Sequence, residues 1–317
     1  MLGAGLIKLR GDQSWLDSTA LYYQFETQPI PGPLSRWFHF LPKAVLKAGV
    51  WFNWLAEIVA PLFVFWPRIG RHIAGVIIVL FQITLIFSGN LSFLNWLTII
   101  PALACFDDDF LYKCLPAVLV RKAVDARNNE QPSKTGTAVA WLVTAVIAIL
   151  SVEPVFNLAS PRQIMNTSFD PLDLVNTYGA FGSVGQERLN VVFEGTADND
   201  STDKAHWQPY IYKGLPVLPD KRPPQIAPYH YRFDWQMWFA SMSAPEDYPW
   251  TVTLVNKLLH NDPAATQLFA ENPFPVAPPR YIRATLYRYS FATAQAPAKV
   301  YWTRQRIGNW LPAIGLH

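Results

Sequence analysis

The stretch HIAGVIIVLFQITLIFS, residues 72–88, is an apolar run with no Asp, Glu, Lys or Arg. In a helix, about 20 mostly apolar residues cross the roughly 30 Å of hydrocarbon in a bilayer. We therefore expect residues 72–88 to form a transmembrane helix. This expectation decides the fold class, because it makes the chain an integral membrane protein.

Three further segments of the first half are candidate spans, at residues 44–66, 91–105 and 137–152. The first is long enough but carries Lys47, Asn53 and Glu57, and the second is short and contains Pro101. Only 15% of the residues are charged, against about 25% in soluble domains, which also favours a membrane protein. The sequence predicts a membrane α-helical bundle of about four spans over residues 44–152.

The topology is predicted from the basic residues, because loops rich in Lys and Arg stay on the cytoplasmic side. The loop 106–136 contains Lys113, Arg121, Lys122, Arg127 and Lys134. We expect this loop to be cytoplasmic, and an N-terminal segment 1–43 and a C-terminal domain 160–317 to lie in the endoplasmic reticulum lumen or the periplasm. Sequons at Asn90, Asn166 and Asn199 would lie on that side and permit N-glycosylation.

The region after residue 160 changes to short alternating runs separated by Pro and Gly, a pattern typical of strands and turns. The predicted strands are 172–178, 188–194, 208–213, 281–291 and 299–306, and the predicted helices are 234–243 and 248–260. Asp234 is a candidate N-cap for the first of these helices. We expect a soluble α+β domain rich in β-strands.

Several functions lack the residues they need. The net charge is only +3 without a basic stripe, which argues against nucleic-acid binding. Scattered histidines, a single pair of cysteines (Cys105 and Cys114) and the lack of phosphate-binding glycine motifs argue against a metal or any other cofactor. Ser183 lies in a Gly-rich stretch, but Phe181 occupies the position where a nucleophile elbow needs glycine. We interpret that stretch as a turn.

Two groups of polar residues are harder to interpret. Lys47 and Glu57 are ten residues apart and would share one helix face, either inside a packed bundle or in a polar substrate cavity. Lys8 stands in the apolar context GLIKL, either at a membrane edge or with a pKa lowered enough for a catalytic base.

The segment KRPPQIAPYHYRFDWQMWFA, residues 221–240, combines arginines with large rings. These residue types are enriched at protein-binding hot spots. On a helix Trp235, Trp238 and Phe239 share one face, so they either contact a partner or pack against the domain core or the bilayer interface.

Six ordered phrases resemble one family, the lipase maturation factors. They are MLGAGLIKLRGDQSW at 1–15, FETQPIPGPLSRW at 25–37, SGNLSFLNWLTI at 88–99, LVNTYGAFGSVGQERLNVVFEGT at 174–196, RPPQIAPYHYRFDWQMWFA at 222–240 and NPFPVAPPRYIRATLYRYSF at 272–291. The resemblance implies a multi-pass protein of the endoplasmic reticulum membrane, without the family's first spans. It also implies a lumenal domain that assists the folding, assembly and maturation of secreted lipases as a chaperone rather than an enzyme. In a bacterium the domain would face the periplasm from the inner membrane.

The same resemblance points to residues for client binding or domain integrity, and the implied partners are secreted lipases or other client proteins and the lipid bilayer. The residues are Asn176, Tyr178, Gly179, Phe181, Gly182, Glu187, Arg188, Arg222, Tyr229, His230, Arg232, Asp234, Trp235 and Trp238.

A shorter phrase, GLIKLRGDQSWL at 5–16, is similar to the vitamin K-dependent carboxylase superfamily. That similarity implies the alternative of a membrane enzyme in which Lys8 acts as a base.

Overall fold

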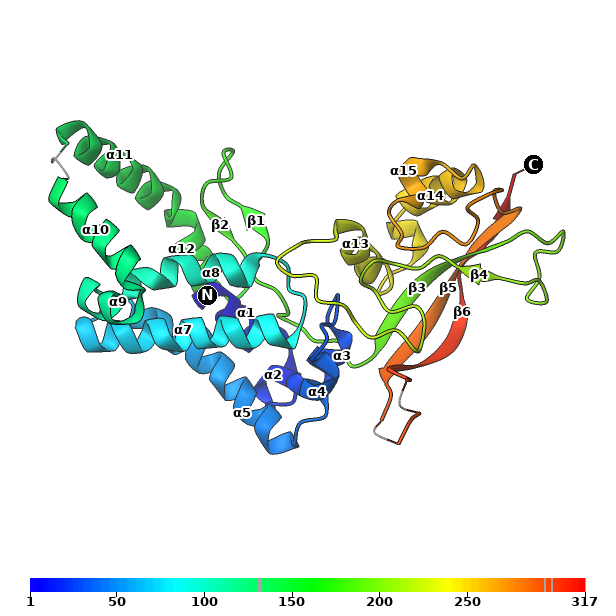
Figure 1. Ribbon diagram of the computed structural model, residues 1–317, viewed down its shortest axis with the longest axis horizontal. Helices are drawn as coiled ribbons and strands as arrows, with labels where there is room; N and C mark the ends of the chain where they lie inside the picture. The colour runs from blue at the N-terminus through cyan, green and yellow to red at the C-terminus, as the bar shows by residue number, and fades with distance from the viewer. Residues whose placement is uncertain (130–132, 294, 298, 317) are drawn as a thin grey trace. The chain divides into compact units, whose positions relative to one another are not determined.

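The computed structural model describes residues 1–129, 133–293, 295–297 and 299–316 (Figure 1). Residues 130–132, part of the predicted cytoplasmic loop, lie outside this description. The chain forms two compact units, each built from segments that are distant in the sequence. The helical unit contains Met1–Ala20, Leu46–Gln82 and Leu97–Val184, and the sheet unit contains Leu21–Val45, Ile83–Trp96 and Gly185–His317.

Most helices belong to the helical unit, and two of its long helices continue into the sheet unit at one end. The elements are α1 (Leu2–Gly11), α2 (Gln13–Leu16), α5 (Lys43–Trp54), the π-helical turn η1 (Leu55–Val59), α6 (Ala60–Leu62), α7 (Arg68–Ser88), α8 (Leu94–Ala102), η2 (Leu103–Cys105), α9 (Asp108–Cys114), α10 (Ala117–Asn129), α11 (Lys134–Leu150), α12 (Val152–Ala159), β1 (Thr167–Ser168) and β2 (Asn176–Thr177). Side-chain caps begin three of them: Asp12 accepts from Ser14 N before α2, Asp107 from Phe110 N before α9, and Ser133 from Gly136 N before α11.

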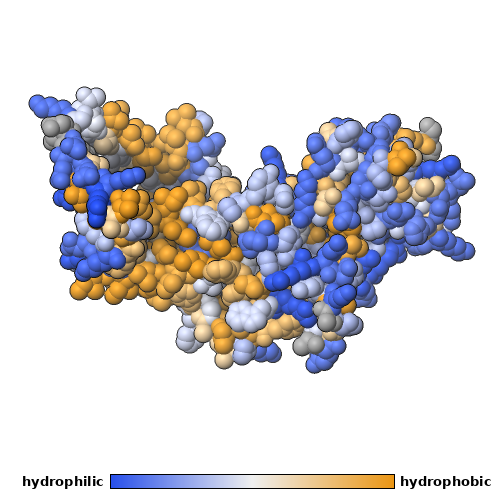
Figure 2. Space-filling model, viewed as in Figure 1, coloured by the Kyte–Doolittle hydropathy of each residue, from blue (hydrophilic) through white to orange (hydrophobic). Residues whose placement is uncertain are grey.

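Among the described residues, three helical stretches are long and apolar enough to cross a membrane: Lys43–Leu62, Arg68–Ser88 and Lys134–Ala159. They correspond to the predicted spans 44–66, 72–88 and 137–152. The fourth predicted span, 91–105, is the shorter apolar helix Leu94–Cys105, so the predicted count of four is not confirmed. Figure 2 shows hydrophobic residues gathered on the outside of these helices, as expected of surfaces solvated by lipid.

The sheet unit contains a four-stranded antiparallel sheet with the strand order β4-β3-β5-β6. Its elements are α3 (Leu21–Thr27), α4 (Ser35–His39), β3 (Arg188–Thr196), β4 (Gln208–Pro209), α13 (Arg232–Ala240), η3 (Pro245–Asp247), α14 (Trp250–Leu259), α15 (Pro263–Thr266), β5 (Tyr281–Phe291) and β6 (Trp302–Gly315). The predicted sheet-containing C-terminal domain is therefore confirmed, and helices and strands are mixed within it.

The predicted strand 172–178 is wrong for most of its length, because β2 covers only Asn176–Thr177. The Asp170 carboxylate accepts hydrogen bonds from the backbone N–H groups of Leu172, Leu174 and Val175. An Asp that bonds its own following backbone holds a turn in place of a strand.

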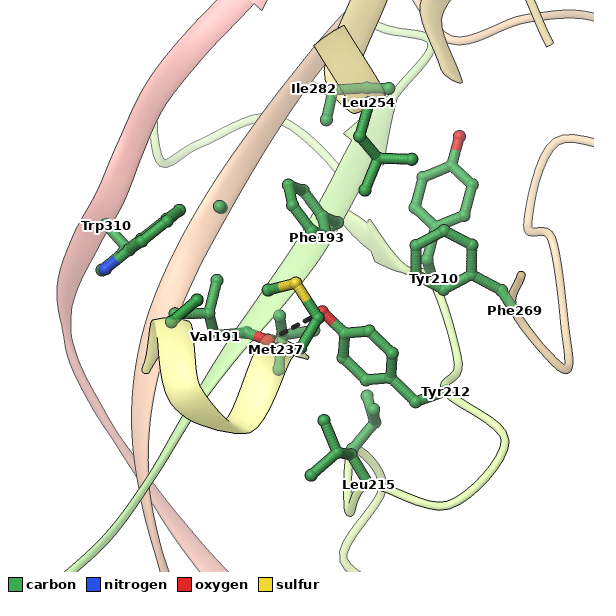
Figure 3. Close-up of a cluster of buried hydrophobic side chains, with 14 of the residues drawn as sticks. Val191, Phe193, Tyr210, Tyr212, Leu215, Met237, Leu254, Phe269, Ile282 and Trp310 are labelled. Atoms are coloured by element: carbon green, nitrogen blue, oxygen red, sulfur yellow. Dashed lines mark hydrogen bonds between the residues drawn. The ribbon is translucent and has the colours of Figure 1, made fainter. Parts of the chain in front are cut away.

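One face of the sheet packs against α13 and α14 (Figure 3). Val191 and Phe193 of β3 alternate with residues of the opposite face, and they meet Met237 and Leu254 from the two helices. Each fully buried apolar side chain of this size contributes roughly 1.5–3 kcal/mol. The Tyr212 hydroxyl reaches into the same core and donates to Val191 O at 2.9 Å.

The other face of the sheet is polar although it is buried. Glu194 accepts from Arg283 Nε at 2.9 Å, from Thr285 Oγ1 at 2.9 Å and from the Tyr287 hydroxyl at 2.6 Å. A buried carboxylate is tolerated when its oxygens are paired in this way. These contacts fix β3 against β5 beyond the backbone ladder.

Arg188, at the start of β3, attaches the segment before the first long helix to the sheet. Its guanidinium donates to Glu26 O at 2.9 Å, Gln28 O at 2.6 Å and Pro29 O at 3.0 Å, and it lies over the Trp302 ring. Burial lowers the pKa of Arg188 to about 9. The group still carries its charge at neutral pH and makes charge-assisted hydrogen bonds.

Gln28 and Asn90 connect the same segment to the end of α7. Gln28 Nε2 donates to Ser35 Oγ at 2.9 Å and to Ser88 O at 3.0 Å. The Asn90 side chain donates to Pro31 O and Pro224 O. The Ser88 end of α7 is therefore part of the sheet unit's own hydrogen-bond network.

Replacing Arg188 by Gln is expected to destabilise the sheet unit by about 3 kcal/mol or more, because hydrogen bonds to charged groups contribute about 1.5–3 kcal/mol each and three carbonyls lose their donor. The measurement is the melting temperature of the full chain in detergent. Arg232→Gln, which removes an exposed guanidinium from the same unit, is the control. Equal melting temperatures for the two variants would show that the Arg188 contacts do not hold the unit together.

Candidate functional site

The helix α13 begins at Arg232, two residues before Asp234. Its N-cap is Tyr231, so the prediction that Asp234 caps the helix is wrong. Asp234 instead lies in the first turn, where its Oδ1 accepts from Gly214 N at 2.6 Å and Leu215 N at 3.0 Å. Burial raises the pKa of this carboxyl to about 6, against the opposing effect of the two backbone hydrogen bonds. Asp234 therefore holds the loop that contains Gly214 and Leu215 against the first turn of α13.

Four rings on and before α13 form a connected row, which we call the aromatic face: His230, Trp235, Trp238 and Phe239. The ring centroids of Trp235 lie 5.3 Å from His230, 6.3 Å from Trp238 and 6.5 Å from Phe239. Edge-on and tilted contacts at such distances are favourable. The opposite side of α13 buries Met237 and Ala240 in the core, so the helix presents this row away from the sheet.

The four rings differ in exposure. Trp238 is half-buried, packs partly against the core and donates from Nε1 to Thr27 O at 2.9 Å. Phe239 remains 41% exposed, and Trp235 is half-buried. Burial, and next the charge of Arg232, lower the pKa of His230, so its ring is neutral at pH 7. The face thus offers apolar surface with an exposed guanidinium beside it.

Two more predicted residues of this segment lie outside the row. Tyr229 is 65% exposed and its ring contacts Tyr231. Arg222 is exposed and donates from Nη2 to Pro33 O at 3.2 Å. Both remain accessible to a partner.

The predicted residues 176–182 lie in the helical unit and make structural contacts there. Asn176 Nδ2 donates to the Tyr178 hydroxyl and to Asp173 O, and Gly179 N donates to Asn166 Oδ1. Phe181 O accepts from Trp15 Nε1 at 2.9 Å. These residues attach the loop to the N-terminal helices.

Gly182 lies close to α1, and Gly11 of that helix permits the approach. A Cβ on Gly11 would lie 2.8 Å from Gly182 O, closer than real Cβ atoms approach an oxygen. The remaining predicted residues, Glu187 and Arg188, belong to the sheet unit, where Glu187 forms an exposed ion pair with Arg288 at 3.1 Å. The structure therefore divides the predicted residues between the two units, and of the 222–239 group it brings His230, Trp235 and Trp238 into contact.

Lys8 is buried, so of its two alternatives the lysine that extends into water at a membrane edge does not fit. Its Nζ lies 2.7 Å from Glu57 Oε2 and 2.9 Å from Asn53 Oδ1, and it lies over the Trp15 ring. Burying an ammonium requires such a partner. Glu57 and Lys47, expected to share one helix face, differ in surroundings, since Glu57 is buried and Lys47 is exposed. Sequence spacing along one helix could not find a partner that comes from α1.

The three sequons differ in their surroundings. Asn90 is buried, and its side-chain oxygen accepts from Ile226 N at 2.7 Å and Ala227 N at 2.9 Å in addition to the two bonds it donates. A glycan there would disrupt these contacts. Asn166 and Asn199 are exposed. Asn166 has a left-handed backbone, with φ 58°, which Asn adopts more readily than most residues.

Long apolar helices, combined with a sheet-containing unit, define the chain as a membrane protein with a substantial polar domain. Two family profiles match it: the lipase maturation factor transmembrane domain over residues 1–113 and the lipase maturation factor C-terminal domain over residues 174–312. The chain belongs to the lipase maturation factor family. The resemblance seen in the sequence is thereby confirmed.

Named relatives agree over the whole chain. It is 44% identical to lipase maturation factor 1 of Mus musculus and 43% identical to that of Homo sapiens, with 100% of this chain aligned to 58% and 59% of those proteins. Lipase maturation factor 2 of Mus musculus is 27% identical over 100% of this chain and 59% of that protein. The chain thus spans under two thirds of the length of these relatives.

No solved structure matches the chain. The weaker similarity to the carboxylase superfamily, and with it Lys8 as a catalytic base, gains no support from these comparisons.

Asp234 makes the stability of the sheet unit depend on pH. Its pKa rises on folding from 3.8 to about 6, so the folded state binds the proton more tightly. The contribution of this group to stability is fully present below about pH 4 and is lost as the pH rises to about 6. Asp234→Asn keeps an oxygen for the two backbone donors and cannot titrate. Relative to wild type, the variant is expected to gain up to about 3 kcal/mol between pH 4 and 6.5.

Melting temperatures of the full chain across this pH range measure the effect, with exposed Asp220→Asn as the matched control. Parallel curves for wild type and Asp234→Asn would contradict the assignment.

Proposed function

We propose that this protein assists the folding, assembly and maturation of secreted lipases. The observation that carries the proposal is the 43–44% identity, over the whole chain, to proteins named lipase maturation factor 1. The role is that of a chaperone, without catalysis of a chemical step. The site of action is the endoplasmic reticulum membrane, or the inner membrane with a periplasmic sheet unit in a bacterium.

The aromatic face is the proposed client-binding surface. Partly folded proteins expose apolar patches, and large rings beside a guanidinium are the side chains that dominate protein-binding hot spots. Trp235 and Phe239 supply the apolar contact, and Arg232 supplies a donor for client carbonyls or carboxylates. Such contacts shield the client until its own assembly buries the patch.

The other predicted residues are proposed to have structural roles. Arg188 and Asp234 hold the sheet unit through buried hydrogen bonds, and Trp238 attaches α13 to α3. Residues 176–182 hold the loop against α1 and α2. Loss of these residues lowers the amount of folded protein and does not act on the client directly.

We further propose that the segment 91–105 crosses the membrane, which gives four crossings. The 21 residues of α7 span about 31 Å. At the Arg68 end of α7, Arg68 and His72 contact Asp107, whereas at the Ser88 end Asn90 N donates to Ile30 O. The chain between Asn90 and Asp107 therefore runs the length of α7, although α8 and η2 cover only part of it as helix.

Four crossings put both termini of the described chain on one side. With the basic loop 106–136 in the cytoplasm, the sheet unit lies in the lumen or periplasm, where secreted lipases fold. The proposed function depends on this orientation.

Client binding is tested by the yield of active secreted lipase, and by co-purification of the lipase with the full chain. Trp235→Ala and Phe239→Ala are each expected to weaken client binding about 30-fold or more, because truncating a hot-spot residue costs at least about 2 kcal/mol. Trp238 is left intact because its loss would also disturb the contact with Thr27.

The matched control is Val252→Ala on α14, which removes apolar surface from a side chain 49% exposed in the same unit. If Trp235→Ala and Phe239→Ala recover as much lipase as the control, the aromatic face is not the client surface. If lipase secretion is the same with and without the gene, the proposed function itself is wrong.

Orientation is tested with the two native cysteines. Cys105 is buried and Cys114 is exposed on α9, so a membrane-impermeant maleimide is expected to label Cys114 in sealed microsomes whose cytoplasmic face is outside. Lys204→Cys in a Cys114→Ser background places a thiol on an exposed loop of the sheet unit and is expected to react only after permeabilisation. Labelling of both positions before permeabilisation would contradict four crossings.

A further inference from the structure

A groove of about 810 Å³ lies in the sheet unit, away from the aromatic face of α13. Its apolar wall is formed by Leu34, Trp37, Phe40 and Leu41, from α4 and the residues around it. Two guanidiniums, of Arg36 and Arg222, and the ring of Tyr301 complete the lining together with Pro33, Thr293 and Gln295. The volume lies in the range of ligand sites, about 300–1,000 Å³.

The apolar wall is exposed although its neighbours are packed. Phe38 contacts the buried ring of Phe25, and α4 is fixed by the buried Ser35. Trp37 nevertheless remains 62% exposed and Phe40 50% exposed. Rings held by a rigid helix with one side uncovered indicate a surface that binds an apolar group.

The groove is held close to the membrane by the chain itself. Leu41 lines the groove, and Lys43, two residues later, begins the first stretch able to cross a membrane, Lys43–Leu62. Two residues extend the chain by about 7 Å at most. Aromatic side chains, Trp above all, are typical of the residues that flank a membrane span at the membrane–water interface.

The charge of the groove is positive. Arg36 Nη2 donates to Thr293 O at 3.0 Å and its guanidinium lies over the Tyr301 ring, while Arg222 Nη2 donates to Pro33 O. These contacts orient both guanidiniums and use only one of the five N–H donors of each among the bonds described. Within the described part of the chain, no carboxylate lines the groove.

From this combination we infer that the groove binds a glycerophospholipid of the leaflet in which the first span begins. The phosphate takes the donors of Arg36 and Arg222, for which phosphate oxygens are well matched acceptors. The acyl chain lies along Leu34, Trp37 and Phe40. A bound lipid would anchor the sheet unit to the membrane surface independently of any client.

A client polypeptide or a second copy of this chain is the competing occupant. A peptide would need partners for its own backbone N–H groups, and the lining offers mainly cations and rings. A lipid brings an anionic head and an apolar tail and needs no such acceptors. The proximity to the span provides that ligand at high local concentration.

The test uses the full chain in nanodiscs of equal parts phosphatidylglycerol and phosphatidylcholine. A benzoylphenylalanine in place of Trp37 is expected, on irradiation, to give an adduct with the mass of one phospholipid. Arg36→Gln or Arg222→Gln in that background is expected to lower the adduct yield about tenfold, the effect of losing a charge-assisted hydrogen bond. Lys221→Gln removes an equal charge at the adjacent exposed position and should leave the yield unchanged.

A second crosslinker position distinguishes a site from general contact with the bilayer. Benzoylphenylalanine in place of Tyr229, which is 65% exposed in the same unit and does not line the groove, is expected to give no phospholipid adduct. Equal adducts at both positions, a yield that ignores both arginines, or an adduct with protein in place of lipid would each overturn the proposal. The adduct yields are compared only between variants whose melting temperatures equal that of the parent protein. If Arg36→Gln melts at a lower temperature, the yield of Arg222→Gln, which changes an exposed side chain, is the deciding result.

Discussion

The guanidinium of Arg188 is the contact on which the sheet unit depends, because it attaches the residues before the first span to the first long strand. It donates hydrogen bonds to three backbone carbonyls within four residues of one another, those of Glu26, Gln28 and Pro29. Gln28 in turn donates to the last residue of α7, Ser88. The sheet unit's own hydrogen bonds therefore include the Ser88 end of α7, a helix long and apolar enough to cross a membrane.

The same network determines where the aromatic face lies. Trp238 donates to Thr27 O, and Thr27 is the neighbour of Gln28, so α13 is held within a few residues of the end of α7. Met237 and Ala240 fill the core on the opposite side of α13. The rings of Trp235 and Phe239 therefore find no space in that core and remain partly exposed.

The sequence predicted the elements whose signals are local. The apolar run at 72–88 became α7, and the alternating run at 281–291 became β5 with the same bounds. It failed where distant residues decide the outcome. Lys8 finds Glu57 across 49 positions, and the residues 21–45 join a sheet whose strands begin after residue 187. Burial and hydrogen-bond partners separate the predicted site residues into different roles, and the spacing of residues in the sequence does not encode either property. Asp234 resembles a helix cap in the sequence, but its carboxylate accepts a hydrogen bond from Gly214, 20 residues away.

Polar contacts hold the sheet unit to the helix ends for a physical reason. Beside a bilayer, burial of apolar surface discriminates poorly between protein and lipid, because lipid tails are as apolar as leucine. Hydrogen bonds are directional, and an unpaired buried amide or carbonyl is costly near hydrocarbon. Gln28, Ser35 and Asn90 pair such groups at the end of α7. Trp37 and Phe40, apolar side chains of the same unit, remain exposed beside these polar contacts.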